Sequence, residues 1–431
     1  MLMSTSSIAL NRRASLVQSL RVQIGLLLTV AVIMPAGLFW LALEQPLFAV
    51  SQLNNSVAGA AAAVILANYI LRRMTAFPGV RAFGYILPCN AIAYGGVLAV
   101  VLVGRFSYSS IYLTASFVLS IAAATGLRYL LERRTVLRFY VVPFGRTEFT
   151  HELPSVEWIM LTEPRLPPDR RIPIVADLRF DLEERWERML ADAALRGQAV
   201  YHTKQLRESL TGKVSIEHLS ENSFGSLIPN LAYAKIKRLV DVVVCLVALP
   251  LLALPMALLA IAIRLESPGP ALFRQRRTGS GGRVFDVLKF RSMYHRPPAQ
   301  GALAQRDHAV TTSDDARITR IGRVMRRKRI DELPQLINVL RGEMSLIGPR
   351  PEALALSHWY EEELPFYTYR HIVRPGITGW AQVNQGHVAD LESVTTKLHF
   401  DFYYIKNYTA WLDMLIAIRT GGIMLTGFGS K

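Results

Sequence analysis

The sequence predicts a membrane protein with three parts: four transmembrane helices in residues 1–135, a small cytoplasmic α/β domain in residues 136–228, and a mainly α-helical domain in residues 229–431. The chain of 431 residues is 51% hydrophobic with a mean hydropathy of +0.25, which is too apolar for a wholly soluble protein. The apolar residues are concentrated in long runs, and the stretches between these runs are polar and basic.

Four apolar segments precede Arg133, and each is predicted to cross the bilayer, whose core needs about 20 apolar residues per helix. They are residues 22–43, 56–71, 83–103 and 111–131. The second segment is short unless it takes in residues 48–53 across Asn54 and Asn55. The first is too long for a signal peptide and lacks a small-residue cleavage site, so we expect it to be retained.

The arginines give the predicted orientation. They cluster before the first helix, after the second and at the end of the fourth, whereas the two intervening loops carry little positive charge, chiefly Arg105. The clustered residues are Arg12, Arg13, Arg21, Arg72, Arg73, Arg81, Arg128, Arg133 and Arg134. Because positively charged loops stay in the cytoplasm, the N-terminus and everything after residue 133 are predicted to be cytoplasmic.

The α/β domain is predicted from its alternation of short elements. One helical stretch, residues 182–195, is surrounded by four runs of β-forming residues at 137–142, 158–161, 172–176 and 199–202. The turn after the first run, residues 141–146, has no G-x-G-x-x-G pattern, so we assign no dinucleotide site to it. A folded spacer or an oligomerisation module is the expected function of this domain.

A further apolar run, residues 242–263, is long enough to span the bilayer but contains Pro250 and Pro255. Proline removes a backbone donor and kinks a helix. Both flanks of the run are basic: Lys235, Lys237, Arg238, Arg264, Arg274, Arg276 and Arg277. Two positive flanks favour one side of the membrane, which predicts a re-entrant helix over residues 235–265 that bends at Pro250 or Pro255. The alternative is a fifth spanning helix with a proline kink.

The charge balance indicates an anionic partner. Lys and Arg outnumber Asp and Glu by 49 to 33, a net charge of +16, which suits nucleic acid, a phosphorylated substrate or acidic lipid. A membrane-anchored nucleic-acid-binding protein should carry a recognition motif, and we find none. A transporter is the other alternative class, but the asparagines in the apolar segments are too few to support it. The cysteines, Cys89 and Cys245, lack metal-ligand spacing and suit a reducing compartment.

An acidic pair, Asp331 and Glu332, stands directly behind the basic run of residues 326–329. Pro334 favours a first helical turn and pushes Leu333 away from α geometry, so we expect the pair at or just before a helix N-terminus. The free N–H groups of such a terminus favour anions, including phosphate. In the alternative interpretation, Asp331 only caps the helix and the basic run is a solvated surface.

Several motifs follow one another in the last 200 residues or so of the chain. They are Ser267-Pro268-Gly269-Pro270, Lys289-Phe290-Arg291-Ser292-Met293, Arg317-Ile318-Thr319-Arg320-Ile321-Gly322, Asp331-Glu332-Leu333-Pro334-Gln335, Gly348-Pro349-Arg350-Pro351-Glu352 and Arg374-Pro375-Gly376-Ile377-Thr378-Gly379-Trp380. With these motifs, residues 235–420 resemble the bacterial sugar transferase family, the monotopic phosphoglycosyl transferases that act on polyprenyl phosphate. The front end resembles the long form of that family. The resemblance implies a re-entrant helix and a catalytic domain on the cytoplasmic face of the bacterial inner membrane.

The resemblance also implies a reaction. The family transfers a sugar 1-phosphate from a nucleotide sugar, usually a UDP-sugar, to undecaprenyl phosphate and releases UMP, as the initiating step of exopolysaccharide, capsule or O-antigen synthesis. Asp331 matches the nucleophile that forms a covalent phosphosugar intermediate, a chemistry open to carboxylates. Glu332 completes the catalytic pair, with magnesium ligation or proton handling as its function. Mg²⁺ is the expected cofactor, held by Asp331 and Glu332, because it bridges phosphates and a carboxylate.

Four basic residues are predicted to bind substrate phosphate. Arg326 matches a phosphate-binding arginine of the family, and Arg350, held between two prolines, is preorganised for a bidentate contact. Lys289 and Arg291 are either further phosphate ligands or structural residues. Three residues of a turn-rich motif are candidates either for contact with the nucleotide sugar or for a structural function: Trp380, Gln382 and Asn384.

Two stretches depart from the commoner family pattern. Arg329-Ile330 precedes the acidic pair where many relatives have Ser or Thr followed by Leu, and Val-Asn-Gln-Gly-His-Val at 383–388 replaces a Val-Asn-Gly continuation. The second departure leaves donor specificity open. Residues 400–420 mix aromatic, apolar and basic side chains, which predicts interfacial helices or, alternatively, packed core helices. Membrane lipids are therefore expected partners beside the two substrates, and a homodimer is a candidate assembly.

Overall fold

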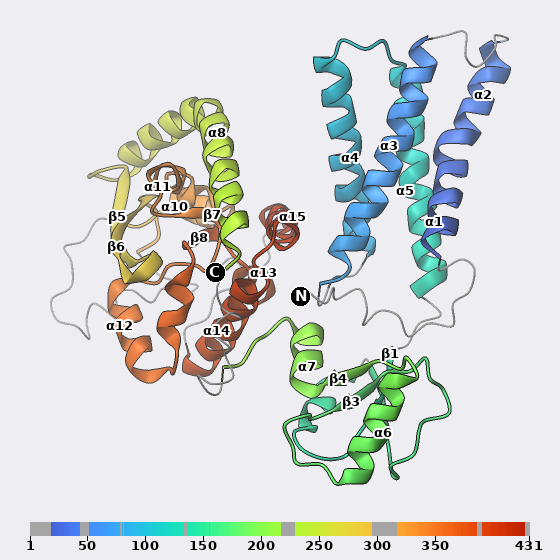
Figure 1. Cartoon of the computed structure of the whole chain (residues 1–431). Helices are drawn as coiled ribbons and strands as arrows, with labels where there is room; N and C mark the ends of the chain where they lie inside the picture. Colours follow the sequence, from blue (N-terminus) through green and yellow to red (C-terminus); the bar gives the residue numbers. More distant parts are fainter. Residues whose placement is uncertain are drawn as a thin grey trace. The chain divides into compact units, whose positions relative to one another are not determined.

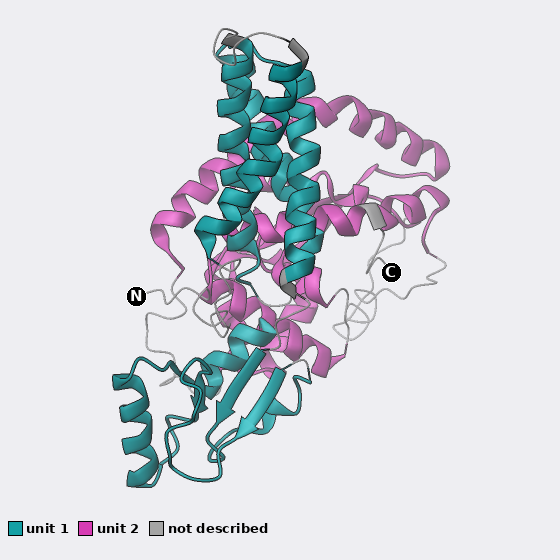
Figure 2. Ribbon diagram, turned by 90° about the vertical axis from the view of Figure 1, so that its right-hand side faces the viewer, with its two compact units in different colours: residues 1–212 teal, residues 213–431 magenta. Residues whose placement is uncertain are grey.

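The computed structural model describes residues 19–43, 51–77, 80, 82–132, 137–154, 156–216, 229–294, 317–385 and 390–426. The chain divides into two compact units, Met1–Gly212 and Lys213–Lys431, coloured teal and magenta in Figure 2. The predicted domain boundaries after residues 135 and 228 lie outside the described residues, so the division into three domains stays a prediction. The same holds for the orientation, because five of its arginines also lie outside them: Arg12, Arg13, Arg81, Arg133 and Arg134.

Unit 1 begins with long apolar helices that lie side by side (Figure 1). They are α1 (Leu20–Leu28), which continues through the π-helical turn η3 (Thr29–Ile33) into α2 (Met34–Leu43), then α3 (Ser51–Met74), α4 (Phe83–Val103) and α5 (Ser110–Glu132). All four stretches are long and apolar enough to cross a membrane. Helix α3 extends the short predicted segment at both ends and includes Asn54 and Asn55.

Polar side chains inside this group of helices bond from one helix to the next. Asn90 Oδ1 accepts a 2.7 Å hydrogen bond from Ser120, and the hydroxyl groups of Tyr94 and Ser116 are 2.7 Å apart. Both pairs join α4 to α5. Satisfied polar pairs of this kind hold membrane helices together.

The second part of unit 1 is a parallel sheet with strand order β2-β1-β3-β4. Its elements are β1 (Leu137–Val141), the 3₁₀ turn η4 (Glu148–Thr150), β2 (Val156–Met160), β3 (Ile174–Ala176), α6 (Glu184–Leu195), β4 (Val200–His202) and α7 (Thr203–Thr211). Successive residues of β1 point to opposite faces. Tyr140 therefore packs in one core with Trp186 of α6, and Phe139 packs in the other with Leu206 of α7.

Asp177 closes the carboxyl edge of this sheet. Its carboxylate accepts the backbone N–H groups of Arg146 at 3.0 Å and of Arg179 at 3.2 Å. Gly145, with φ +74°, lies so close that a Cβ there would come within 2.6 Å of the Asp177 Cβ. Parallel sheets bind phosphates at this edge through backbone N–H groups. Here the Asp177 side chain accepts two of those N–H groups.

Unit 2 is mainly α-helical and contains two small sheets. Its elements are α8 (Leu231–Glu266), β5 (Leu272–Thr278), η6 (Ser280–Gly282), β6 (Val284–Phe290), α10 (Arg320–Arg327), η7 (Ile330–Glu332), α11 (Gln335–Arg341), β7 (Ser345–Ile347), α12 (Leu354–Glu363), η8 (Tyr367–Ile372), β8 (Gly376–Thr378), α13 (Trp380–Asn384), α14 (Leu391–Lys406) and α15 (Ala410–Thr426). Strands β5 and β6 pair antiparallel, and β7 and β8 pair parallel.

Helix α8 contains both prolines of the apolar run and consists of two arms joined by a bend (Figure 1). A straight helix of 36 residues would be about 54 Å long. Both ends of α8 instead bond to the same compact unit. Near the start, Arg238 donates to Leu340 O of α11 at 2.9 Å, and at the end Arg291 donates to Ile263 O at 3.2 Å.

The two arms of α8 pack on two apolar clusters of unit 2. Cys245 in the first arm packs with Val339 of α11, and Ile263 in the second packs with Phe290 of β6. Exposed apolar side chains occur along the whole helix: Leu239 is 64%, Leu251 73%, Leu254 70% and Leu265 83% accessible. The exposed apolar surface of α8 thus extends over both arms and includes the stretch around the prolines.

The C-terminal helices take part in the core of unit 2. Tyr403, Tyr404 and Ile405 of α14 are buried, as are Leu412 and Leu415 of α15. For these buried residues the structure supports the packed alternative. The prediction of interfacial helices over residues 400–420 stays a prediction, because Ala410 is exposed and Trp411 and Met414 are half-buried.

Candidate active site

The acidic pair lies in the 3₁₀ turn η7, between α10 and α11. Arg329, with φ 55°, adopts the left-handed conformation that reverses the chain before the turn. Pro334 is the N-cap residue of α11, so the pair stands immediately before a helix N-terminus, as the sequence predicts. The acidic pair thus lies on a short, tightly turned segment.

Glu332 is fixed by two cations. Its Oε1 accepts a 2.6 Å hydrogen bond from Arg350 Nη2 and lies 3.6 Å from Lys289 Nζ. Burial alone would raise the pKa of Glu332, but the charges of Arg350 and Lys289 outweigh it and hold this pKa below its ordinary value. Glu332 is therefore ionised at neutral pH.

Asp331 is in a different state. Among the residues that the structure describes, its carboxylate has no hydrogen-bond or ion-pair partner. Burial, and next the charge of Glu332, raise the pKa of Asp331, while Lys289, Arg350 and Arg326 act to lower it. A more basic carboxylate with both oxygens uncommitted is the better nucleophile of the two.

Lys289 and Arg326 complete the positive surroundings of the pair. Burial, followed by the charge of Arg350, lowers the pKa of Lys289 to about 8. Arg326 lies in the last turn of α10, half-buried, and its charge acts on Asp331. Its guanidinium group has no partner within the described part of the chain, so it is available to an anionic ligand.

The loop that carries Arg350 is held by buried charges. Arg370 Nη2 donates to the backbone carbonyl of Arg350 at 2.8 Å, and Arg277 donates to the carbonyl of Pro351. Glu352, at the end of the loop, pairs with Lys397. Burial would raise the pKa of Glu352, but Lys397, Arg370 and Arg277 hold it below its ordinary value.

Arg370 is itself fixed by a carboxylate. Its Nε and Nη2 donate to Asp401 Oδ2 of α14 at 3.1 and 2.8 Å. Sequence reasoning missed Arg370, Asp401, Arg277 and Lys397. No local pattern marks them, because they come from three elements far apart in the chain and face the site only after folding.

Arg291 is placed away from the acidic pair. It is 5% exposed and donates to the carbonyls of Ser267 at 2.7 Å and of Pro268 at 2.8 Å, beyond the end of α8. It therefore caps the C-terminus of the bent helix. Of its two predicted functions, the structure supports the structural one.

The turn-rich motif also has its side chains engaged within the protein. Trp380 is buried, stacks on Tyr403 with ring centroids 5.7 Å apart, and lies beneath Arg419. Gln382 donates to Ile377 O at 3.3 Å, and Asn384 donates to Trp380 O at 2.8 Å. These contacts favour the structural alternative. Residues Gly386, His387 and Val388 of the departure at 383–388 lie outside the described residues.

The predicted Mg²⁺ fits one member of the pair better than the other. No group of three or more His, Cys, Asp or Glu side chains able to hold a metal occurs among the described residues. Mg²⁺ commonly keeps several waters and uses one or two carboxylates together with substrate phosphates. Asp331 can supply such a ligand, whereas Glu332 Oε1 is already committed to Arg350 and Lys289.

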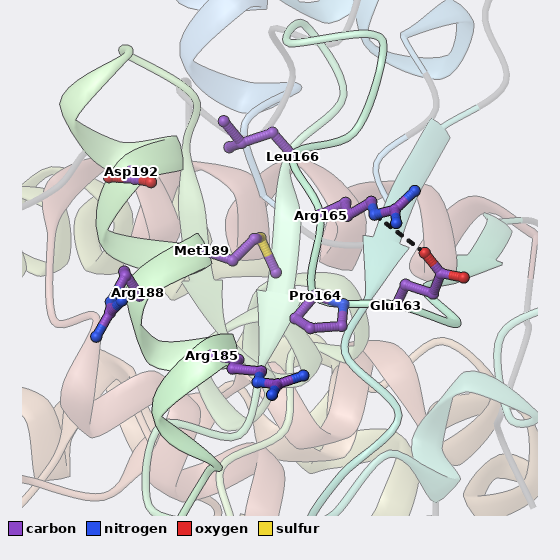
Figure 3. Close-up of a pocket in the computed structure, with 8 residues that line it drawn as sticks. All are labelled: Glu163, Pro164, Arg165, Leu166, Arg185, Arg188, Met189 and Asp192. Carbon is purple, nitrogen blue, oxygen red and sulfur yellow. Dashed lines mark ion pairs between the residues drawn. The ribbon is translucent and has the colours of Figure 1, made fainter.

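A separate cavity lies in the α/β part of unit 1, between α6 and the loop after β2 (Figure 3). Its arginines pair with neighbouring glutamates: Arg165 with Glu163 at 3.2 Å, Arg188 with Glu184 at 2.5 Å and Arg185 with Glu183 at 3.7 Å. The cavity contains none of the residues of the acidic-pair site.

Comparison with known proteins identifies the family. The model of the bacterial sugar transferase family matches residues 232–427. The UDP-N-acetylgalactosamine-undecaprenyl-phosphate N-acetylgalactosaminephosphotransferase of Aeromonas hydrophila is 43% identical over 378 residues, 88% of each chain. UDP-glucose:undecaprenyl-phosphate glucose-1-phosphate transferases of Caulobacter vibrioides and Escherichia coli are 44% and 40% identical over 204 and 200 residues, 47% and 46% of this chain and 74% and 41% of theirs.

The chain therefore belongs to the bacterial sugar transferase family, and it is a phosphoglycosyl transferase. The Aeromonas relative aligns well beyond the 232–427 region, so it shares part of the front end as well.

Proposed function

We propose that this enzyme transfers a sugar 1-phosphate from a UDP-sugar to undecaprenyl phosphate through a covalent intermediate on Asp331, as the initiating step of exopolysaccharide, capsule or O-antigen synthesis. The observation that carries the proposal is the asymmetry of the pair. Glu332 is held by Arg350 and Lys289, while Asp331 has no partner among the described residues. One carboxylate organises the site and the other is free to react.

The first step is attack of an Asp331 oxygen on the phosphorus linked to the sugar. A bond forms between that oxygen and phosphorus, and the bond from phosphorus to the UMP oxygen breaks, so that UMP leaves with the electron pair. Arg326 and Lys289 are placed to offset the negative charge of the phosphates. A phosphosugar ester of Asp331 remains.

The second step restores the enzyme. A phosphate oxygen of undecaprenyl phosphate attacks the same phosphorus, and the bond to Asp331 breaks, which gives the polyprenyl-diphosphate sugar and the free carboxylate. Because Glu332 is held ionised by Arg350 and Lys289, we assign it the positioning of these cations rather than proton donation. Mg²⁺, when bound through Asp331 and the substrate phosphates, would neutralise part of the diphosphate charge.

The bent α8 supports a re-entrant helix with the catalytic unit on the cytoplasmic face of the bacterial inner membrane. Arg238 and Arg291 tie the two ends of α8 to one compact unit, and a membrane-spanning helix would place its ends on opposite sides. The exposed leucines between the arms would enter the lipid.

The test is an assay for both products. Membranes that contain the enzyme are incubated with undecaprenyl phosphate and either UDP-N-acetylgalactosamine or UDP-glucose, the donors named for the relatives. UMP and a lipid-linked sugar should form with one of them. After incubation with donor alone, mass spectrometry should find a phosphosugar on Asp331. Near-normal turnover of Asp331→Asn, which keeps the shape but removes the attacking charge, would sink the covalent mechanism.

A further inference from the structure

Gln335, the first residue of α11, has a buried polar side chain that the arrangement above does not use. It is 2% exposed, and its Nε2 makes no hydrogen bond within the described part of the chain. A buried amide donor without a partner costs free energy, and native proteins leave few of them. A partner from outside the chain would explain it.

The backbone places Gln335 next to the acidic pair. Leu333 N donates to Ile330 O at 3.2 Å and Leu336 N donates to Leu333 O at 3.1 Å, so the turn η7 continues into α11 as one helical path. On a path with hydrogen bonds between residues three apart, side chains at that spacing share a face. Gln335 follows Glu332 by three positions and therefore lies one turn from Glu332, the chain neighbour of Asp331.

The polar side chains three residues before and three residues after Gln335 both have partners within the protein. Glu332, three residues before, approaches Lys289 of β6. Asn338, three residues after, accepts from Leu288 N at 3.0 Å and donates to Asp286 O at 2.7 Å, also on β6. Gln335 stands between two side chains that have partners, while its own Nε2 has none among the described residues. This contrast favours a ligand as its partner.

We propose that the carboxamide of Gln335 donates a hydrogen bond to a phosphate oxygen of the nucleotide sugar held beside Asp331. The inference rests on the proposed function. A phosphate oxygen is the fitting acceptor because the groups around the pair, Lys289, Arg350 and Arg326, are cations that attract an anion. Rotation about the last torsion of the side chain, which has broad minima, can turn its NH₂ group toward that oxygen.

The test compares two variants of the full-length enzyme on the same helix. Gln335→Met keeps the length of the side chain and removes the donor. We expect its melting temperature to equal or exceed that of the wild type, and its kcat/KM for UMP release to fall about 10- to 100-fold, or about 1.4–2.8 kcal/mol. Asn338→Leu is the matched control, and its melting temperature should fall because it leaves Leu288 N and Asp286 O unpaired. Wild-type kcat/KM in Gln335→Met, or a fall in melting temperature like that of the control, would overturn the inference.

A second variant separates a donor from an acceptor. Gln335→Glu cannot donate when ionised and would repel a phosphate, so its kcat/KM should be lower than that of Gln335→Met. A rate equal to or above that of Gln335→Met would overturn the assignment as a donor. In an Asp331→Asn background, the rise in melting temperature caused by the UDP-sugar should shrink when Gln335→Met is added, and an unchanged rise would count against the contact. If the wild type makes no UMP with either donor, the proposed function fails, whereas normal wild-type turnover with unaffected Gln335→Met overturns this inference alone.

Discussion

Arg350 donates a 2.6 Å hydrogen bond to Glu332, and Asp331, its neighbour in the chain, receives none from any described residue. The backbone at Arg350 is held in place by two other arginines. Arg370 donates to the carbonyl of Arg350, and Arg277 donates to the carbonyl of Pro351. Glu332 is therefore anchored through Arg350, whereas the carboxylate of Asp331 is left to react.

Removing Arg350 should cost both stability and activity. Arg350→Met leaves Glu332 buried with Lys289 as its remaining ion-pair partner among the described residues. Breaking one side of a buried ion pair costs about 3–5 kcal/mol, so we expect a clear fall in melting temperature. Adding Glu332→Gln should recover much of the stability but not the rate of UMP release. Unchanged stability in Arg350→Met would contradict the anchoring of Glu332.

The activity should decline at alkaline pH because of Lys289. Burial and the charge of Arg350 lower its pKa from 10.5 to about 8. Its ion pair with Glu332 is lost with the proton, so kcat/KM should fall as the pH rises through about 8. A pH–rate profile checks this, with Lys289→Arg as the control because arginine keeps its charge. An identical alkaline limb in Lys289→Arg would assign the titration to another group.

The same shift affects stability with the opposite sign. Between pH about 8 and 10.5, the unfolded chain holds more protons at Lys289 than the folded chain does. Stability rises with pH where the unfolded state binds more protons. The melting temperature of the wild type minus that of Lys289→Met should therefore increase across this window. A flat or falling difference would show that Lys289 is not charged at the lower end of the window.

Asp401 should act on the reaction through Arg370 and the Arg350 loop. Asp401→Asn weakens the hold on Arg370, whose Nη2 binds both Asp401 and the carbonyl of Arg350. We expect kcat to fall more than KM rises, because the loop that carries Arg350 loses its support while substrate ligands remain. A double variant, Arg370→Met with Asp401→Leu, should regain stability without regaining kcat. Recovery of both would show that the network serves folding alone.

The acidic pair was predictable because its signal is local. Asp331, Glu332 and Pro334 lie within one turn, and Arg326 is only a turn and a half away. The bend of α8 was predictable for a similar reason, since prolines and flanking charges occur within one segment.

The residues that hold the Arg350 loop could not be predicted from the sequence. Nothing in the local sequence of a single basic residue shows whether it will be buried or solvated. Arg277, Arg370 and Lys397 come from β5, η8 and α14, and only the tertiary structure collects them. Arg291 shows the converse. It stands in a motif with Lys289, yet it follows the last residue of β6 and caps α8 through the Ser267 carbonyl.

The two ends of α8 should be accessible from the same side of the membrane. Single cysteines at Ala232 and Ser280, in a background with Cys89 and Cys245 replaced by Ala, should both react with an impermeant maleimide only from the cytoplasmic side. A cysteine at Arg105, between α4 and α5, is the control for the opposite side. Labelling of Ala232 and Ser280 from opposite sides would establish a fifth span.

Unit 2 should keep its membrane attachment and its activity without the front of the chain. The residues assigned to the reaction, from Lys289 to Arg350, all belong to unit 2. The exposed part of α8, with Leu251, Leu254 and Leu258, supplies an anchor of its own. Burying each leucine in lipid contributes about 1.5–3 kcal/mol. We therefore expect a truncated chain that begins at Ile228 to stay in the membrane fraction after a carbonate wash and to release UMP.

A second truncation, beginning at Lys213, separates catalysis from stability. Val214 N donates to His399 O at 2.9 Å and Lys213 lies over the ring of Phe400, so the first residues of unit 2 pack on α14, the helix that carries Asp401. The Lys213 chain should therefore melt at a higher temperature than the Ile228 chain while both share the same nucleophile. Activity in both, with the longer chain more stable, would place the whole reaction in unit 2. A folded, membrane-inserted Lys213 chain without activity would show that the helices or the α/β part of unit 1 supply a group that the reaction needs.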